Sequence, residues 1–329
     1  MKLFVQIPCF NEEHTLKYVI NSIPKKIDGI SELKIIIIDD SSTDNTIEIA
    51  KSARVNYILK NHCNLGLAQT FKRGLEACLY LGADIIVNTD GDNQYNNEDI
   101  SKIIKPILEN KADYVVGCRD IRRHSEFSWS KKIFQLLGSK IIQKMTGENI
   151  SDATSGFRAM NRNAALQFSI LNHFSYTLET LIQASRIGLK TIGIPIRNNP
   201  ALRPSRLFRS IPEFILKQSM TIVSIYLFWN PYRFFFYPAL ISFFISLFSS
   251  SRVIYYLFFV ERGFEKIKIG SAIFFSISFT FTLILIIAGL LGQVIFSLRM
   301  LMIDLRTRVR NIELQRKIKP HNLDIITIN

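Results

Sequence analysis

The sequence predicts an α/β domain with a mainly parallel sheet, followed by two membrane helices. Three observations support this fold class: strand-like and helix-like stretches alternate up to about residue 200, polar residues directly follow several strand-like stretches, and two long apolar stretches lie beyond residue 230. Strands that alternate with helices form a parallel sheet covered by helices on both faces. We therefore expect residues 1–210 to form one α/β domain.

The elements of this domain are expected from their apolar patterns. Strands are expected where apolar and β-branched residues run together, at 3–7, 34–38, 55–59, 85–89 and 114–117. Helices are expected where apolar residues recur at helical spacing, at 12–23, 47–53 and 68–81. Pro8 should end the first strand, because proline has no N–H for the ladder. Ser42 or Thr43 should cap the helix at 47–53.

Two apolar stretches of the second half are long enough to cross a bilayer, which takes about 20 apolar residues. Residues 269–298 are uncharged, and residues 234–260 contain Arg252 as their only charge. We expect transmembrane helices at 233–260 and 269–298, in preference to two buried core helices.

Basic residues flank both spans. Five Arg and Lys residues lie between positions 197 and 217 and seven lie between 299 and 319, whereas the loop 261–268 carries three bases and two acids. By the positive-inside rule, both ends of the chain face the cytoplasm and the loop lies outside. Residues 211–232 are expected to form a juxtamembrane amphipathic helix, or a core helix of the soluble domain. Residues 299–329 are expected to form a basic cytoplasmic tail, so the chain is predicted to be an integral protein of the inner (plasma) membrane.

Composition narrows the class of partner. The net charge is +14, and the 25 phenylalanines are concentrated after residue 200, which favours a membrane over a nucleic acid. The four cysteines form no C-x-x-C pair, so neither a zinc ribbon nor a disulfide framework is indicated. The amino terminus runs directly into a strand pattern and lacks the features of a signal peptide.

Paired carboxylates follow the fourth expected strand. Asp90 and Asp92 are one residue apart, and Gln94 is two residues further on. The carboxyl ends of parallel strands are where open α/β sheets place their ligands. Oxygen ligands of this kind suit Mg²⁺ or Mn²⁺, which would neutralise a diphosphate. The alternative is an ordinary polar turn, since Asp, Gly and Asn are common after any strand.

Two other strand ends are also polar. Phe10 and Glu12 follow the first strand, where a nucleoside would rest on the ring and bond its ribose hydroxyls to the carboxylate. Asp39 and Asp40 end the second strand, where a carboxylate would accept N–H groups of a nucleobase. The alternatives are an ordinary strand-to-helix turn and helix capping.

Three further motifs are weaker when each is taken alone. The segment 64–68 opens a helix whose backbone amides would face phosphate, and the Ser-Gly turn in 152–158 would wall a sugar pocket. Residues 203–209 carry three arginines, which bind phosphate in a bidentate fork or attract anionic lipid heads. Together the motifs indicate a nucleoside-diphosphate ligand that meets a membrane-bound acceptor.

The complete set of motifs, in this order, resembles glycosyltransferase family 2, and within it the polyprenyl-phosphate glycosyltransferases related to dolichyl-phosphate mannose synthase. The segments that carry the resemblance are P-C-F-N-E-E, D-D-S-S-T-D, N-L-G-L-A, D-G-D-N-Q, S-G-F-R, Y-T-L-E-T and R-P-S-R-L-F. Ser41 departs from the pattern, since the family usually has Gly after the Asp pair.

The resemblance implies a GT-A (Rossmann-like) fold and assigns roles to individual residues. Asp92 and Gln94 would hold Mg²⁺ or Mn²⁺, with Asp90 near the ribose or the metal. The residues that would hold the nucleoside are Pro8, Phe10, Glu12 and either Asp39 or Asp40. Arg119 would approach the phosphates or the sugar. The residues that would grip the lipid phosphate are Lys131 or Lys132, Arg203 and Arg206.

The function implied is inverting transfer of a sugar from a nucleotide sugar to a polyprenyl (undecaprenyl or dolichyl) phosphate, which supplies lipid-linked sugar for the cell envelope. Two alternatives stay open: a family-2 transferase that acts on a saccharide acceptor, and a non-catalytic nucleotide-binding membrane scaffold. Self-association as a homo-oligomer also stays open.

Overall fold

The structure is a computed structural model that describes residues 1–120, 129–170, 176–200, 219–220, 223–224, 226–259, 269–320 and 323–328. The chain divides into two compact units. One comprises Met1–Leu216 together with Ile303–Asn329, and the other comprises Lys217–Met302.

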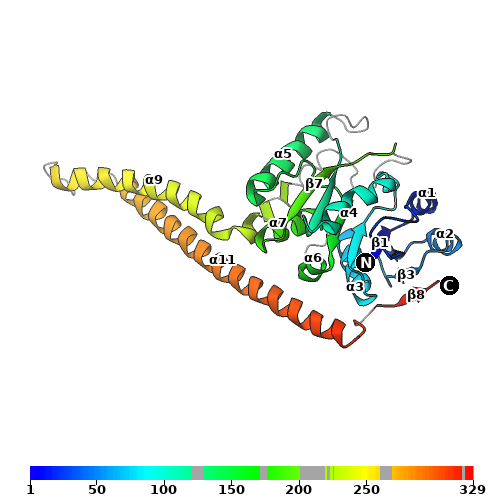
Figure 1. Ribbon diagram of the computed structural model, residues 1–329. Coiled ribbons are helices and arrows are strands. Elements are labelled where there is room, and N and C mark those ends of the chain that lie inside the picture. The colour runs from blue at the N-terminus through cyan, green and yellow to red at the C-terminus, as the bar shows by residue number, and fades with distance from the viewer. Residues whose placement is uncertain are drawn as a thin grey trace. The chain divides into compact units, whose positions relative to one another are not determined.

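Among the described residues, the first unit is built on one eight-stranded sheet in the order β7-β5-β6-β4-β1-β2-β3-β8 (Figure 1). The strands are β1 (Lys2–Cys9), β2 (Glu32–Asp39), β3 (Tyr57–Lys60), β4 (Ile85–Asn88), β5 (Tyr114–Cys118), β6 (Arg158–Asn161), β7 (Thr191–Pro195) and β8 (Ile325–Thr327). Neighbouring strands are parallel except that β6 is antiparallel to β4 and β5, and β8 is antiparallel to β3. The expected mainly parallel sheet is therefore confirmed.

Helices cover both faces of the sheet. The helices α1 (Leu16–Asn21), α2 (Thr46–Ser52) and α4 (Ile100–Leu108) pack on one face. The helices α3 (Leu67–Tyr80), α6 (Arg162–Gln167) and α7 (Thr177–Arg186) lie on the other, and α5 (Trp129–Thr146) packs on α7. In α4 the buried isoleucines at 100, 103, 104 and 107 follow helical spacing, so one stripe of that helix enters the core.

Pro8 does not end the first strand as the sequence predicted, because β1 continues through it to Cys9. The Gln6 carbonyl accepts from Thr89 on the β4 side, and the Cys9 carbonyl accepts from Asp40 on the β2 side. Since strand residues alternate sides, Pro8 faces the β4 side, where pairing has already stopped at Gln6. The missing N–H therefore costs the ladder nothing.

The start of α2 also differs from the predicted cap. Its N-cap is Asn45, with no side-chain cap bond. The Asp44 carboxylate instead accepts from the backbone N–H groups of Thr46 and Glu13. Ser42 accepts from the N–H of Asn11, so this segment joins the loops after β1 and β2 rather than capping the helix alone.

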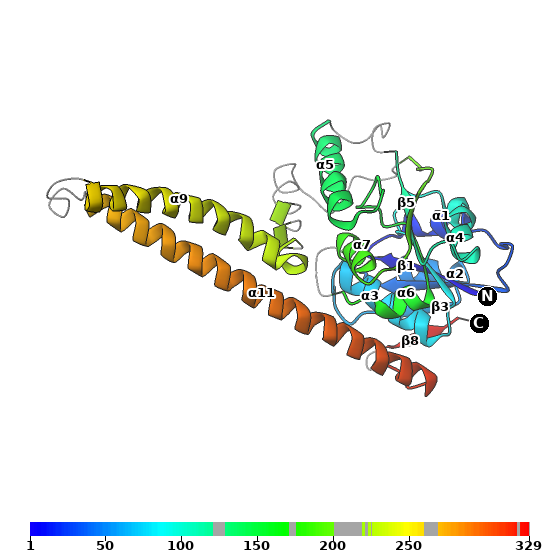
Figure 2. The same cartoon turned by 60° about the vertical axis from the view of Figure 1, so that its left-hand side comes forward.

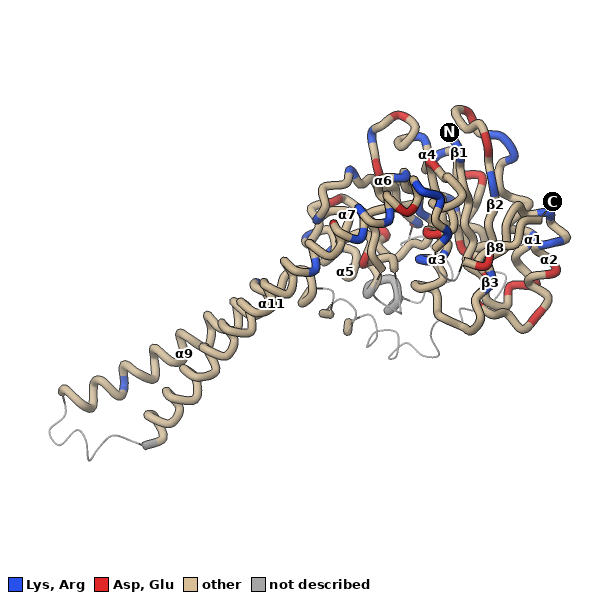
Figure 3. The backbone as a smooth tube through the Cα atoms, turned by 90° about the horizontal axis from the view of Figure 1, so that it is seen from below, with Lys and Arg blue, Asp and Glu red and all other residues tan. Residues whose placement is uncertain are grey.

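The second unit contains α9 (Pro231–Phe259) and most of α11 (Ile269–Gln315), both long and apolar enough to cross a membrane. Within this unit the two helices run side by side (Figures 1 and 2). Charged residues on α9 are limited to Arg233 and Arg252, and α11 has none before Arg299 (Figure 3).

Small residues join α9 to α11. Ser242 donates to the Ser278 carbonyl at 2.9 Å and accepts from the Thr282 hydroxyl at 3.0 Å. A Cβ at Gly292 would lie 2.7 Å from the Pro231 ring, so glycine permits this close approach. Contacts of this type hold helices together in lipid, where apolar packing gives no advantage over lipid contact.

The stretch predicted as a basic tail, 299–329, carries ordered elements. Helix α11 continues to Gln315, and β8 pairs with the edge strand β3. Ile303 is buried, and Arg306 donates to Glu76 of α3 at 3.1 Å and to Ser169 at 2.8 Å. The carboxyl-terminal residues are thus part of the α/β unit.

Candidate functional site

The site lies where β1, β2 and β4 end. Register places Cys9 beside Asp39, so the loops that follow β1 and β2 leave the sheet together. The Thr15 hydroxyl links the loop after β1 to the loop after β4, because it lies 2.8 Å from the Glu12 carboxylate and 2.7 Å from the Gly91 carbonyl oxygen. A Cβ on Gly91 would approach Cys9 and Glu12 within 3.2 Å. The first acidic loop and the D-G-D turn therefore pack directly on each other.

Asp90 sits against the Ser-Gly turn of the 152–158 segment. A Cβ on Gly156 would come within 2.6 Å of its carboxylate, so only glycine leaves the carboxylate its room. Burial, then the neighbouring charge of Asp92, raise the pKa of Asp90 to about 7, although Arg119 opposes the shift. One carboxylate oxygen, Oδ1, is buried without a hydrogen-bond partner among the described residues. In the described part of the chain, Asp90 thus keeps an oxygen without a hydrogen-bonded partner, although the charges of Arg119 and Arg158 act on it.

A divalent cation fits this arrangement. Asp92 and Gln94 are half-buried, and the Gln94 N–H donates to Asp92 Oδ1 at 3.2 Å, which closes the turn. Asn93 holds that turn with φ of 61°. Within the described residues no group of three or more His, Cys, Asp and Glu is arranged as a metal site. A cation here would take carboxylate and amide oxygens from the chain and its other ligands from substrate or water, as Mg²⁺ often does.

Arg119 is not free at the end of β5. Its Nε donates to Asp152 Oδ2 at 2.6 Å, and its Nη2 lies 3.3 Å from Oδ1 and 3.2 Å from the Thr154 hydroxyl. Arg119 is 8% exposed and Asp152 is fully buried. Burial alone would raise the pKa of Asp152, but the guanidinium holds it below its ordinary value. The pair fixes the start of the segment that reaches Asp90.

Arg158 also binds the 152–158 segment. This fully buried guanidinium donates to the carbonyls of Ser155 and Ala153 and to that of Thr177 in α7. It also contacts the Tyr114 hydroxyl. Arg119 and Arg158 thereby hold the segment that leads into the Ser-Gly turn, which lies against Asp90.

The two aspartates after β2 have different partners. Asp40 accepts from Asn61 Nδ2 at 2.7 Å and from the backbone N–H groups of Leu65 and Gly66, each at 2.9 Å. These two amides, which the sequence suggested for phosphate, are therefore engaged by Asp40. Asp39 accepts from the Ser42 N–H at 3.3 Å, and burial raises its pKa.

The remaining predicted residues divide into described and undescribed positions. Phe10 is 40% exposed beside this edge, and Glu12 is buried. Arg203 and Arg206 lie outside the described residues. Lys131 and Lys132 belong to α5, but the structure does not describe their side chains.

Comparison with known proteins gives the site its context. Residues 4–167 match the family model described as Glycosyl transferase family 2. The UDP-N-acetylglucosamine–dolichyl-phosphate N-acetylglucosaminyltransferase of Methanococcus voltae is 31% identical over 217 residues, which cover 59% of this chain and 84% of that protein. This chain belongs to glycosyl transferase family 2. It is a glycosyltransferase, as the motifs predicted.

Other known proteins are also similar to the chain. The undecaprenyl-phosphate mannosyltransferase of Micrococcus luteus is 23% identical over 60% of this chain and 83% of its own length. Among solved structures, glucosyl-3-phosphoglycerate synthase from Mycobacterium tuberculosis in complex with phosphoglyceric acid aligns with a TM-score of 0.51 at 20% identity. The alignment covers 69% of this chain and 79% of that chain. This likeness establishes the GT-A fold predicted from the sequence.

Three site residues were missed from the sequence. Thr15 joins two loops, Asp152 pairs with Arg119, and the Tyr95 hydroxyl accepts from the Gly156 N–H at 2.8 Å. Tyr95 directly follows D-G-D-N-Q, and Asp152 opens the segment that contains the S-G-F-R motif. Their partners are distant in sequence, so the motifs predicted where the site lies but not which residues contact one another there.

Proposed function

We propose that this family-2 glycosyltransferase moves a sugar from a nucleotide sugar to a polyprenyl phosphate with inversion at the anomeric carbon. The observation that carries the proposal is the junction of the Glu12, Asp90 and Gly156 loops at one sheet edge, in a chain with two helices able to cross a membrane. The similar transferases from Methanococcus voltae and Micrococcus luteus are named for dolichyl-phosphate and undecaprenyl-phosphate. A lipid acceptor explains why the catalytic domain carries membrane helices.

The donor would occupy the edge formed by the first, second and fourth strands. Pro8, Phe10 and Glu12 would contact the nucleoside, because they line the end of β1 beside Asp39. Asp39 or Asp40 would accept N–H groups of the base. Asp40 already has three donors, so its role in binding would be shared with holding the 61–66 loop.

The leaving diphosphate would be stabilised near Asp90 and Asp92. A divalent cation held by Asp92 and Gln94 would neutralise charge on the leaving diphosphate. The unpartnered Asp90 oxygen and the raised pKa of that carboxyl support a cation at this position. Arg119 would act through the 152–156 segment, which it holds with Asp152, as well as through its charge.

The acceptor phosphate would approach from the membrane side. Lys131 or Lys132, with Arg203 and Arg206, would bind it. A phosphate monoester is already an anion at neutral pH, since its second pKa is about 6. The nucleophile therefore needs little help from a general base, and the protein contributes chiefly by holding both substrates in line.

The topology supports this arrangement. Both ends of the chain would face the cytoplasm, where nucleotide sugars are made, and 261–268 would lie outside. The joining of the carboxyl-terminal tail to the sheet through β8 is consistent with this, because it requires both ends of the chain on one side.

The test is turnover by purified full-length protein. UDP- and GDP-sugars would be offered with undecaprenyl phosphate, with and without Mn²⁺ or Mg²⁺, and nucleoside diphosphate release would be measured. We expect metal-dependent release that Asp92→Ala abolishes. Lipid-independent release of equal rate would favour a saccharide acceptor or water, and a near-normal rate for Asp92→Ala with excess metal would show the metal assignment to be wrong.

A further inference from the structure

Helix α11 carries an apolar seam that nothing in the described chain covers. Beyond Arg299 the side chains of Met302, Leu305, Val309 and Ile312 are 70%, 61%, 51% and 50% exposed. Their spacing of three, four and three residues is the a/d repeat of a coiled coil, and all four lie on one side of the helix. Ile303 and Arg306, which contact the α/β unit, lie on another side of the same turns.

Lipid does not reach the end of this seam. The 47 residues of α11 extend about 70 Å, whereas the hydrocarbon core of a bilayer is about 30 Å thick. Val309 lies ten residues beyond Arg299, the first charged residue of the helix, or about 15 Å along its axis. Large apolar side chains at that distance stand in water unless a protein surface covers them.

The same repeat continues back through the membrane span. Steps of four and three residues connect Met302 without interruption to Ile277, and Phe281 and Ile284 belong to the series. Residues 277–298 are uncharged throughout, so the span permits this repeat, and the exposed residues beyond Arg299 set its register.

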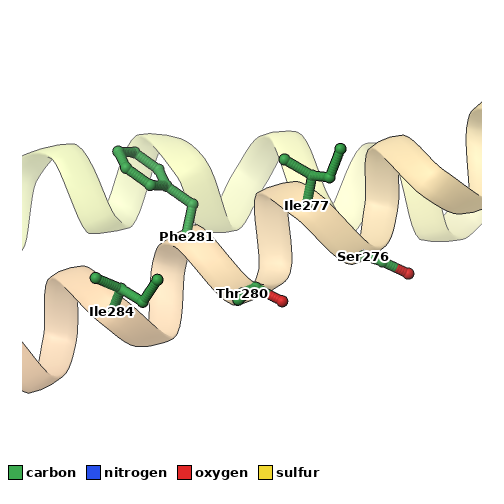
Figure 4. A pocket seen from close by; sticks show the side chains of 5 residues that line it. All are labelled: Ser276, Ile277, Thr280, Phe281 and Ile284. Carbon is green, nitrogen blue, oxygen red and sulfur yellow. The ribbon is translucent and has the colours of Figure 1, made fainter.

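A hollow on α11 has the form that such a partner requires. It is lined by Ser276, Ile277, Thr280, Phe281 and Ile284 (Figure 4). Four of these residues occupy positions i, i+3, i+4 and i+7, which is the set that forms the hole for an incoming side chain in knobs-into-holes packing. The side chains of Ile277, Phe281 and Ile284 border it and belong to the seam.

We propose that the partner is α11 of a second copy of this chain, in a parallel two-stranded coiled coil. Two copies inserted in one membrane have the same orientation, so their α11 helices run parallel. In that arrangement Arg308 faces Glu313 of the other copy across the seam, five residues on, and the pair forms twice. Arg308 is bound within its own helix only to the exposed Asp304, so it can change partner at little cost.

Cysteine cross-linking in native membranes tests the seam. Cys63 is the exposed cysteine, and Cys9, Cys78 and Cys118 are buried. The variant Cys63→Ser therefore has no exposed native thiol that could cross-link. In it, Val309→Cys places a thiol on the seam and Asn311→Cys places one on an exposed position of the same turn away from it. With copper phenanthroline as oxidant, we expect the Val309→Cys dimer to form at least about tenfold faster, because disulfides need Cβ atoms about 4 Å apart. Equal rates, or no dimer at 309, would overturn the proposal.

A second measurement determines the mass of the assembly in lipid nanodiscs and needs no cross-linking. Leu305→Glu puts a charge on the seam, and Asn311→Glu puts the same charge off it. In lipid nanodiscs we expect the wild type and Asn311→Glu to have the mass of two chains and Leu305→Glu that of one. Nucleotide binding should be unchanged in both variants, since both positions are exposed in the single chain. A dimer that survives Leu305→Glu would place the interface elsewhere.

Discussion

The buried pair of Arg119 and Asp152 gives the sharpest prediction about how the site is held. Asp152→Asn keeps the shape of the side chain but removes its charge and turns an amide N–H toward the guanidinium. Removing one partner of a buried ion pair costs about 3–5 kcal/mol. Because Asn retains one oxygen as an acceptor, we expect the lower end, about 3 kcal/mol. For a domain of this size that corresponds to a fall in Tm of roughly 6–12 °C.

The chain supplies a matched control. Arg308 and Asp304 form an ion pair with the same atoms, Nε to Oδ2, at 2.9 Å, but their side chains are 74% and 59% exposed. Exposed pairs at this helical spacing contribute about 0.3–0.5 kcal/mol, so Asp304→Asn should shift Tm by no more than about 2 °C. Thermal unfolding of the purified full-length chain, followed by circular dichroism, measures both.

A double variant separates the contribution of this ion pair to stability from its contribution to sugar transfer. Replacing both partners, Arg119→Met with Asp152→Leu, should recover much of the lost stability, because no buried charge is left unpaired. It should not recover sugar transfer, since Arg119 also contributes charge beside Asp90. If Asp152→Asn lowered Tm no more than Asp304→Asn does, the argument that this pair holds the site would be refuted.

Three further predictions concern the same unit. Gly156→Ala should lower kcat/KM by about 10²-fold. The new Cβ would lie 2.6 Å from the Asp90 carboxylate, and displacing a catalytic group by about 1 Å has effects of that size. A near-normal rate would show that Asp90 has room to move. The Tm gap between wild type and Asp152→Asn, measured from pH 7 downward, should stay constant above about pH 4 and then narrow. A carboxylate whose pKa is lowered in the fold contributes stability above its unfolded pKa and loses it as pH falls through the folded one. A gap that stays constant or widens as the pH falls below about 4 would contradict this sign. Deleting residues 321–329 removes β8 and the buried Leu323 and should cost about 2–4 kcal/mol in unfolding free energy; an unchanged Tm would mean that the tail adds no stability to the sheet.

The sequence predicted the parts of the fold that local pattern determines. The runs of isoleucine at 35–38 and 85–86 marked central strands because buried parallel strands are apolar on both faces. The antiparallel direction of β6 was not foreseen, since direction depends on how the chain returns and not on the strand itself. Pro8 was misjudged because the consequence of a missing N–H depends on which neighbour that residue faces.

The candidate site was located better than it was explained. Asp90, Asp92 and Gln94 lie one after another in the chain, so their grouping could be predicted directly. The support of that group comes from residues far away in sequence, such as Asp152 and Arg158, whose role depends on tertiary packing. The ordered tail was also missed because its structure depends on tertiary packing. Ile325–Thr327 is too short to be predicted as a strand from its sequence, and it is a strand because it pairs with β3.

Transfer of radiolabel to lipid tests the central claim most directly. Membranes that contain the full-length chain would receive labelled UDP- or GDP-sugars, undecaprenyl phosphate and Mn²⁺ or Mg²⁺, and the organic phase would be counted, with Asp92→Ala membranes as the control. The account predicts label in the organic phase for at least one donor and none with Asp92→Ala. No label from any donor, in membranes whose chain still binds nucleotide, would contradict the lipid acceptor and leave the saccharide acceptor or the scaffold role.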